Sequence, residues 1–96
     1  MIEFIDEVGG IYFRSIILQK GQVVDQHTHD YDHATYIGSG SVEMYADNKP
    51  VGTVPAGRAV LVKAGVYHVF SALENNTRLT CVHDVKSAES IKVKGA

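Results

Sequence analysis

Apolar and polar positions alternate in short runs along this chain and show no sustained helical spacing. The runs are rich in β-branched and aromatic residues and are separated by glycine, proline, asparagine and aspartate, a pattern typical of strands joined by turns. Eight strands are predicted, at Ile11–Leu18, Val23–His29, Ala34–Ile37, Ser41–Ala46, Val51–Val54, Arg58–Val62, Val66–Ser71 and Thr77–Val85. So many short strands in a small chain predict an all-β fold, a sandwich or a β-barrel of jelly-roll type.

Both ends of the chain depart from this simple picture. Ile2–Ile5 and Ile91–Val93 also alternate apolar residues, and a single helical turn is the most that Ser87–Ser90 can form. A terminal strand with unpaired backbone groups pairs readily with another chain. We therefore expect a homodimer.

Composition bounds the class of protein. The chain has 96 residues, of which 45% are hydrophobic and 21% charged, enough for one packed domain over residues 1–96 and too apolar for disorder. Its core is small, so a bound metal or a dimer interface would add stability. The net charge of −2 comes without a basic run, which argues against nucleic acid as a partner.

The sequence also predicts the compartment. The N-terminus lacks a cationic segment followed by an apolar one, and no stretch approaches the roughly 20 apolar residues of a membrane helix. Cys81 is the single cysteine, so an intrachain disulfide is excluded. We expect a cytoplasmic protein that has no membrane partner.

Histidines are the clearest chemical feature. His27 and His29 are two residues apart, so they share one face of a strand at about 6.6 Å. His33 can join them if the chain turns at Asp30–Asp32, which is suitable turn chemistry. His68 lies on a later apolar strand and can join only in a closed or sandwiched sheet. Neutral imidazole binds Zn, Cu, Fe and Ni.

A second interpretation of the histidines stays open at this point. A lone histidine such as His68 is more often a structural residue than a ligand. Three histidines among acidic residues can form a solvated loop whose charge depends on pH. On the residues alone, metal binding and this alternative are equally supported.

Glycines frame the histidines at a specific spacing. The chain contains Gly21-x5-His27-x-His29-x3-His33-x6-Gly40. This resembles the first motif of the cupin superfamily, G-x5-H-x-H-x3,4-E-x6-G, with one departure. His33 stands where that motif has glutamate.

A second segment, at about residues 57–72, resembles the second cupin motif, G-x5-P-x-G-x2-H-x3-N. Gly57, Gly65 and His68 match it, whereas Lys63 and Ala72 replace the proline and the asparagine. The two motifs place the chain among small single-domain cupins. The resemblance implies a jelly-roll barrel with one metal at its centre.

The resemblance also implies the ligand set. One divalent transition metal, Mn, Fe, Ni or Zn, would be held by His27, His29, His33 and His68. Four neutral ligands leave the ion its full positive charge, which favours anionic ligands. An octahedral ion would keep two positions open for substrate, whereas a tetrahedral zinc would be closed and structural. We expect the open site.

Other residues of the site are weaker predictions. Alternation along the strands suggests three residues that line a substrate pocket, although core packing is the commoner role for such residues: Met44, Phe70 and Cys81. Each ligand imidazole needs an acceptor for its second nitrogen, and Asp25, Asp30 and Asp32 are candidates. His83 shares a face with Cys81, but we expect it at the surface and outside the metal set. Arg14 and Arg58 could bind a substrate carboxylate, although surface charge is their default role.

These features predict a metal-dependent enzyme acting on a small molecule. The resemblance suggests dioxygenase, lyase or isomerase chemistry, and a redox metal would make the protein an oxidoreductase. Two alternatives are a non-catalytic cupin that binds or senses a small ligand, and a barrel whose metal is purely structural. No catalytic residue can be named from the sequence.

Overall fold

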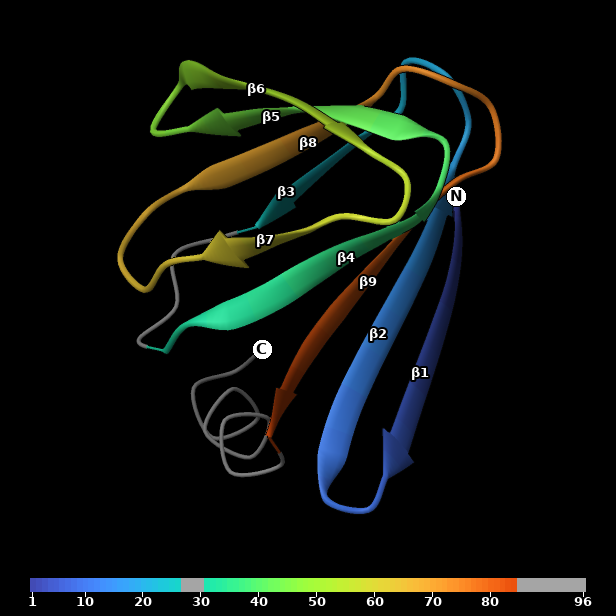
Figure 1. Cartoon of the computed structure of the whole chain (residues 1–96), viewed down its shortest axis with the longest axis vertical. Coiled ribbons are helices and arrows are strands. Elements are labelled where there is room, and N and C mark those ends of the chain that lie inside the picture. Colours follow the sequence, from blue (N-terminus) through green and yellow to red (C-terminus); the bar gives the residue numbers. More distant parts are fainter. Residues whose placement is uncertain (27–30, 85–96) are drawn as a thin grey trace.

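The computed structural model describes residues 1–26 and 31–84, and all of its regular elements are strands. They form two antiparallel sheets that face each other as a jelly-roll barrel (Figure 1). The predicted all-β fold class is therefore confirmed. Within the described residues, no helix is long and apolar enough to cross a membrane.

One sheet has five strands in the order β1-β2-β9-β4-β7, and the other has four in the order β3-β8-β5-β6. The five-stranded sheet contains β1 (Ile2–Val8), β2 (Ile11–Leu18), β4 (His33–Ser39), β7 (Ala59–Val62) and β9 (Thr77–Asp84). The four-stranded sheet contains β3 (Val23–Gln26), β5 (Ser41–Ala46), β6 (Lys49–Pro55) and β8 (His68–Ala72). Strands distant in sequence thus become neighbours, as β2 and β9 do.

Each of the eight predicted strands has a counterpart among the described residues, with changes at several ends, and the predicted ends at residues 27–29 and at Val85 lie outside the described residues. β8 begins at His68 instead of Val66, because Val66 and Tyr67 belong to the connection that follows β7. The alternation at Ile2–Ile5 extends to Val8 and pairs with β2. The segments Ser87–Ser90 and Ile91–Val93 lie outside the described residues.

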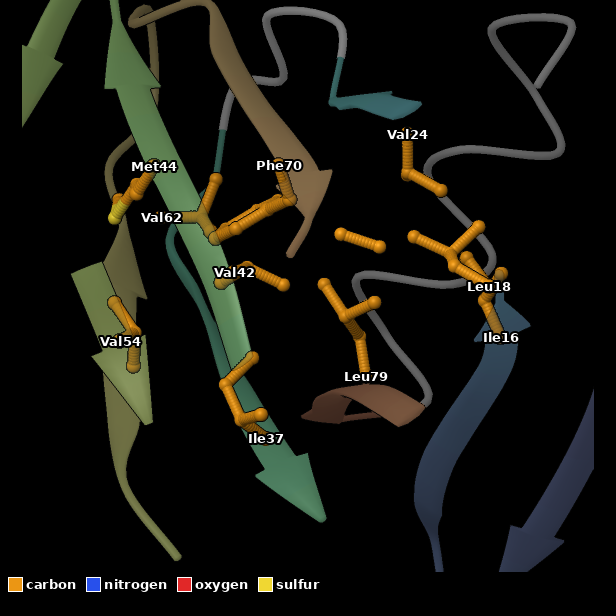
Figure 2. Packing of buried hydrophobic residues seen from close by; sticks show 11 residues of the cluster. Ile16, Leu18, Val24, Ile37, Val42, Met44, Val54, Val62, Phe70 and Leu79 are labelled. Atoms are coloured by element: carbon orange, nitrogen blue, oxygen red, sulfur yellow. The ribbon is translucent and has the colours of Figure 1, made fainter. Parts of the chain in front are cut away.

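The core fills the space between the two sheets (Figure 2). Ile16 and Leu18 from β2, Ile37 from β4 and Leu79 from β9 are fully buried. They meet a matching set from the four-stranded sheet that includes Val42, Met44, Phe70 and Ala72. Along β4, β5 and β8 buried positions alternate with more exposed ones, which is the period of two expected of a barrel.

Gly40 explains one fixed position of the first motif. Its φ is +71°, and a Cβ built there would lie 2.8 Å from the Cα of Thr77. Only glycine therefore fits where β4 turns into β5 against the start of β9. The other three motif glycines, Gly21, Gly57 and Gly65, also have positive φ.

Candidate functional site

His33 and His68 lie at the same end of the barrel, one in each sheet. His33 opens β4 and is paired with Val62, the last residue of β7, whereas His68 opens β8 directly after the β7–β8 connection. Their side chains are 5% and 3% exposed. Each shares an inward face with core residues, His33 with Ile37 and His68 with Phe70. The two imidazoles are therefore enclosed by the barrel.

A hydrogen bond ties the strand of one histidine to the approach of the other. The Ala64 N–H, in the connection between β7 and β8, donates to Asp32 Oδ1 at 2.7 Å. Asp32 directly precedes His33, and Ala64 lies shortly before His68. This contact fixes the start of β4 against the turn that leads to β8.

Both imidazoles have Nδ1 next to a backbone carbonyl. His68 Nδ1 lies 3.1 Å from the Val66 oxygen, and His33 Nδ1 lies 3.4 Å from the Ala34 oxygen. If Nδ1 carries the proton, it donates to the carbonyl and Nε2 keeps its lone pair. This is the tautomer in which a histidine binds a metal through Nε2, with its other nitrogen held by an outer acceptor. The donor set therefore fits a metal.

Carbonyl oxygens thus occupy the place for which aspartates were candidates. Asp32 accepts from Ala64, and Asp25 accepts from the Tyr67 hydroxyl at 3.2 Å. Asp30 lies outside the described residues. The second nitrogens of the two described imidazoles are held by the backbone.

His27 and His29 also lie outside the described residues. Gln26, which directly precedes them, is paired with His68 at the end of β3, so this strand runs toward the same end of the barrel. Among the residues that the structure describes, no three histidines, cysteines or carboxylates form a metal-holding group. The four-histidine set stays a prediction, to which His33 and His68 contribute two buried donors.

His83 was expected at the surface, and that expectation is wrong. Its side chain is half-buried because β9 continues to Asp84 between its neighbouring strands, with His83 paired to Tyr12. The His83 ring stacks on Tyr12 at 4.6 Å and lies 6.1 Å from the His33 ring, between ring centroids. The parity shared with Cys81 was the signal that His83 faces inward.

Tyr31 completes this aromatic group. Its ring centroid lies 5.2 Å from that of His83 and 6.1 Å from that of His33. Burial and, to a smaller extent, the charges of the nearby Tyr12 and Cys81 raise the pKa of Tyr31 to about 12. The phenol is therefore neutral at physiological pH and can donate a hydrogen bond. Neither Tyr12 nor Tyr31 was predicted as a site residue, although Tyr12 has the inward parity of Ile16.

The three predicted pocket residues are all buried. Met44 and Phe70 belong to the hydrophobic core cluster. Cys81 lies beside that cluster, with its Sγ 3.6 Å from Thr35 Oγ1. A role for any of them in contacting substrate stays a prediction. Arg14 forms an ion pair with Glu3.

Comparison with known protein families finds one match, over the part of the chain that contains both motifs. The family model described as "Cupin domain" matches residues 14–83. No curated protein matches the sequence.

Solved structures agree with this match. KdgF from a Halomonas species has a TM-score of 0.71 at 16% identity, over 83% of this chain and 74% of that one. A Streptococcus pyogenes protein of unknown function, SPY1581, has a TM-score of 0.65 at 25% identity, over 79% and 65%. The Cupin_2 domain of an XRE-family transcriptional regulator from Enterobacter cloacae has 0.68 at 18%, over 84% and 92%. At these identities the likeness concerns the fold.

Proposed function

The chain belongs to the cupin domain family, and from that premise we propose that it is a metal-dependent enzyme acting on a small molecule. In this proposal His27, His29, His33 and His68 hold one divalent transition metal. The observation that carries it is the pair of buried imidazoles, one in each sheet, whose Nδ1 atoms lie against backbone carbonyls. With Nδ1 protonated, Nε2 keeps the lone pair through which a histidine binds a metal.

The metal would supply a positive centre that stabilises negative charge developing on a substrate oxygen. The chain's own residues would then orient the substrate. Tyr31, with its pKa raised to about 12, would donate a hydrogen bond to an anionic oxygen without losing its proton. His83, held flat against Tyr12, would form one wall of the site and limit the width of the ligand.

The substrate class that suits this arrangement is a small oxygen-rich molecule, such as a β-dicarbonyl, a hydroxy acid or a sugar. Dioxygenase, lyase and isomerase reactions all fit a positive centre beside a phenol donor. A redox metal such as Fe or Mn would favour the first, and Zn or Ni the other two.

A second candidate function is ligand sensing without catalysis. This alternative is supported by the similar fold of the Cupin_2 domain of a transcriptional regulator, because 92% of that domain is matched by this chain and a regulator needs to bind a ligand without converting it. In that case the same site would bind a ligand and release it unchanged.

The test is turnover by the full chain loaded in turn with Mn, Fe, Ni and Zn. Oxygen consumption and product formation are measured over a panel of β-dicarbonyls, hydroxy acids and sugars. We expect turnover with at least one metal, and a rise in KM or a fall in kcat in Tyr31→Phe. Full metal loading without turnover would reject the enzyme. Saturable binding of a ligand that is recovered unchanged would then favour sensing. A bound metal that has no exchangeable water would favour a structural role.

A further inference from the structure

The imidazoles of His33 and His68 lie against carbonyl oxygens that are held in different ways. The acceptor next to His33 is the Ala34 oxygen, which belongs to β4 and is held by the pairing of that strand with its neighbours. The acceptor next to His68 is the Val66 oxygen, which belongs to the connection between β7 and β8 and to no strand. The position of this second acceptor therefore depends on the contacts that hold the connection.

Asp47 holds the same peptide group that faces His68. The peptide group between Val66 and Tyr67 has the Val66 oxygen on one side and the Tyr67 N–H on the other. The oxygen lies 3.1 Å from His68 Nδ1, and the N–H donates to Asp47 Oδ1 at 3.0 Å. Because a peptide group is planar and stiff, fixing its N–H also fixes the direction of its oxygen. With the proton on Nδ1, hydrogen bonds run from the carboxylate through one peptide group to the imidazole.

Asp47 reaches this peptide group from the turn between β5 and β6. Asp47 and Asn48 have φ values of +48° and +65°, which a two-residue hairpin turn requires and which aspartate and asparagine tolerate. The Asp47 N–H also donates to the Tyr67 oxygen at 2.7 Å, so the backbone and the side chain of Asp47 both hold Tyr67. The Asn48 side chain makes no hydrogen bond within the described part of the chain.

Two other carboxylates hold the connection at different atoms. Asp25 accepts from the Tyr67 hydroxyl, and Asp32 accepts from the Ala64 N–H. Asp47 differs from both because it accepts from the peptide group next to the imidazole. It is also distant in sequence from all four histidines of the predicted metal set, so that a substitution there leaves both motifs unchanged.

A carboxylate in this place affects the imidazole as well as the backbone. A hydrogen bond to a charged acceptor is stronger than one between neutral groups, and hydrogen bonds in a chain polarise one another. The Val66 oxygen therefore becomes a better acceptor for Nδ1–H when Asp47 accepts from the other side of the peptide group. This favours the tautomer in which Nε2 keeps its lone pair. Carboxylates that bond a ligand histidine directly have the same effect on the ring.

We propose that Asp47 is a positioning residue for His68, which acts through the peptide group between Val66 and Tyr67 and sets the tautomer and direction of the imidazole. The inference rests on the proposed function in taking His68 as a metal ligand. It assigns to the turn between β5 and β6 a part in metal binding that neither histidine motif contains. The competing role for Asp47 is to shape the turn alone.

The test compares Asp47→Gly with Asp47→Asn in the full chain. Glycine adopts positive φ without strain, so Asp47→Gly removes the acceptor and keeps the turn, whereas Asp47→Asn keeps an acceptor oxygen. Co²⁺ is titrated into the apo protein, and its affinity and visible absorption spectrum are recorded. Because the carboxylate is exposed, we expect Asp47→Gly to lower the affinity about tenfold, at the lower end of the effect of a ligand's outer partner. Asp47→Asn should restore most of it.

Asn48→Gly is the matched control, since it adds the same backbone freedom at the next position of the same turn. It should leave both the Co²⁺ affinity and the spectrum unchanged. A readout without metal is the tautomer of His68 in the apo protein, which long-range ¹H–¹⁵N NMR reports. We expect the proton on Nδ1 in the wild type and in Asp47→Asn, and a mixture of both tautomers in Asp47→Gly.

Three outcomes separate this inference from the proposed function. Wild-type affinity and an unchanged tautomer in Asp47→Gly would overturn the positioning role and leave the metal site intact. Equal losses of affinity in Asp47→Gly and Asn48→Gly would assign Asp47 to the turn alone, and would overturn it too. A wild type that binds no Co²⁺, although its His68 tautomer changes in Asp47→Gly, would reject the metal site and support the action of Asp47 on His68.

Discussion

The two ends of the barrel interior are built from different kinds of residue. Along β4 the inward positions change from His33 through Thr35 to Ile37, and along β9 they change from His83 through Cys81 to Leu79. On β2 and β8 the change is the same: Tyr12 and His68 lie at one end, and Leu18 and Ala72 at the other. In these four strands the inward side chains therefore change from polar to apolar toward the same end of the barrel.

The two ends of the barrel interior therefore have different roles, one in stability and the other in binding. The apolar end buries its side chains against each other, where each contributes roughly 1.5–3 kcal/mol. The polar end encloses imidazoles and phenols, which cost free energy unless their polar atoms are bonded. Substitutions at the apolar end should thus change stability, and substitutions at the polar end should change binding.

Phe70→Ala should give the largest loss of stability. Phe70 is fully buried at the centre of the core (Figure 2), and removing such a ring costs about 3–5 kcal/mol. Urea denaturation measures the change in the free energy of unfolding. Phe4→Ala, at an exposed phenylalanine, is the control and should cost far less in the monomer. Equal losses would contradict the placement of the core.

Gly40→Ala should be nearly as harmful, at about 2–4 kcal/mol, because the strain of positive φ adds to a backbone clash with Thr77. Gly57→Ala is a matched control, since Gly57 has a φ of +85° but no atom within 4 Å of the added Cβ. It should show the conformational strain alone. Thermal and urea unfolding of both variants provide the measurement.

His68→Ala should act on the polar end instead. We expect metal affinity to fall more than a hundredfold, since even partners of a ligand change affinity 10- to 100-fold, while the apo protein stays folded. Titration of the apo protein with Zn or Ni, followed by calorimetry, gives the affinity. His83→Ala is the comparison, and it should retain the metal. Unchanged affinity in His68→Ala would remove that residue from the site.

Tyr31→Phe should have the smallest effect on stability, confined to alkaline pH. The folded chain holds the Tyr31 proton up to a pKa of about 12, whereas the unfolded chain releases it near 10. The unfolded state therefore binds fewer protons between pH 10 and 12, so the free energy of unfolding falls as pH rises there. Tyr31→Phe should make this slope shallower by at most one proton, as measured by urea unfolding at a series of pH values between 10 and 12. Equal slopes in wild type and Tyr31→Phe would contradict the burial of the phenol.

Local patterns predicted most strands and their inward faces. Alternation at Val42–Met44 and at His68–Phe70 was sufficient, because the period of two is a property of a single strand. It could not show that His83 lies beside Tyr12, since that depends on which strands are neighbours and in which register. The same limit hid the exposed apolar side chains that gather on the outer side of the five-stranded sheet only when it is assembled: Ile2, Phe4, Val8, Ile11, Tyr36 and Leu61.

Some residues of the candidate site could likewise be predicted from local patterns, and others could not. His33 and His68 were predicted as inward-facing, and the structure places both at one buried end of the barrel. Tyr31 was taken only as part of a turn, because a turn residue has no parity from which to infer its direction. The four-histidine set rests on a motif resemblance, and His27 and His29 lie outside the described residues.

Elemental analysis tests the central claim most directly. The full chain is purified without chelator and without a nickel resin, and its transition metals are quantified against protein concentration. We predict close to one ion per chain in the wild type and almost none in His68→Ala. A wild type that carries no transition metal, and takes up none when Mn, Fe, Ni or Zn is supplied, would contradict the assignment of the polar end as a metal site.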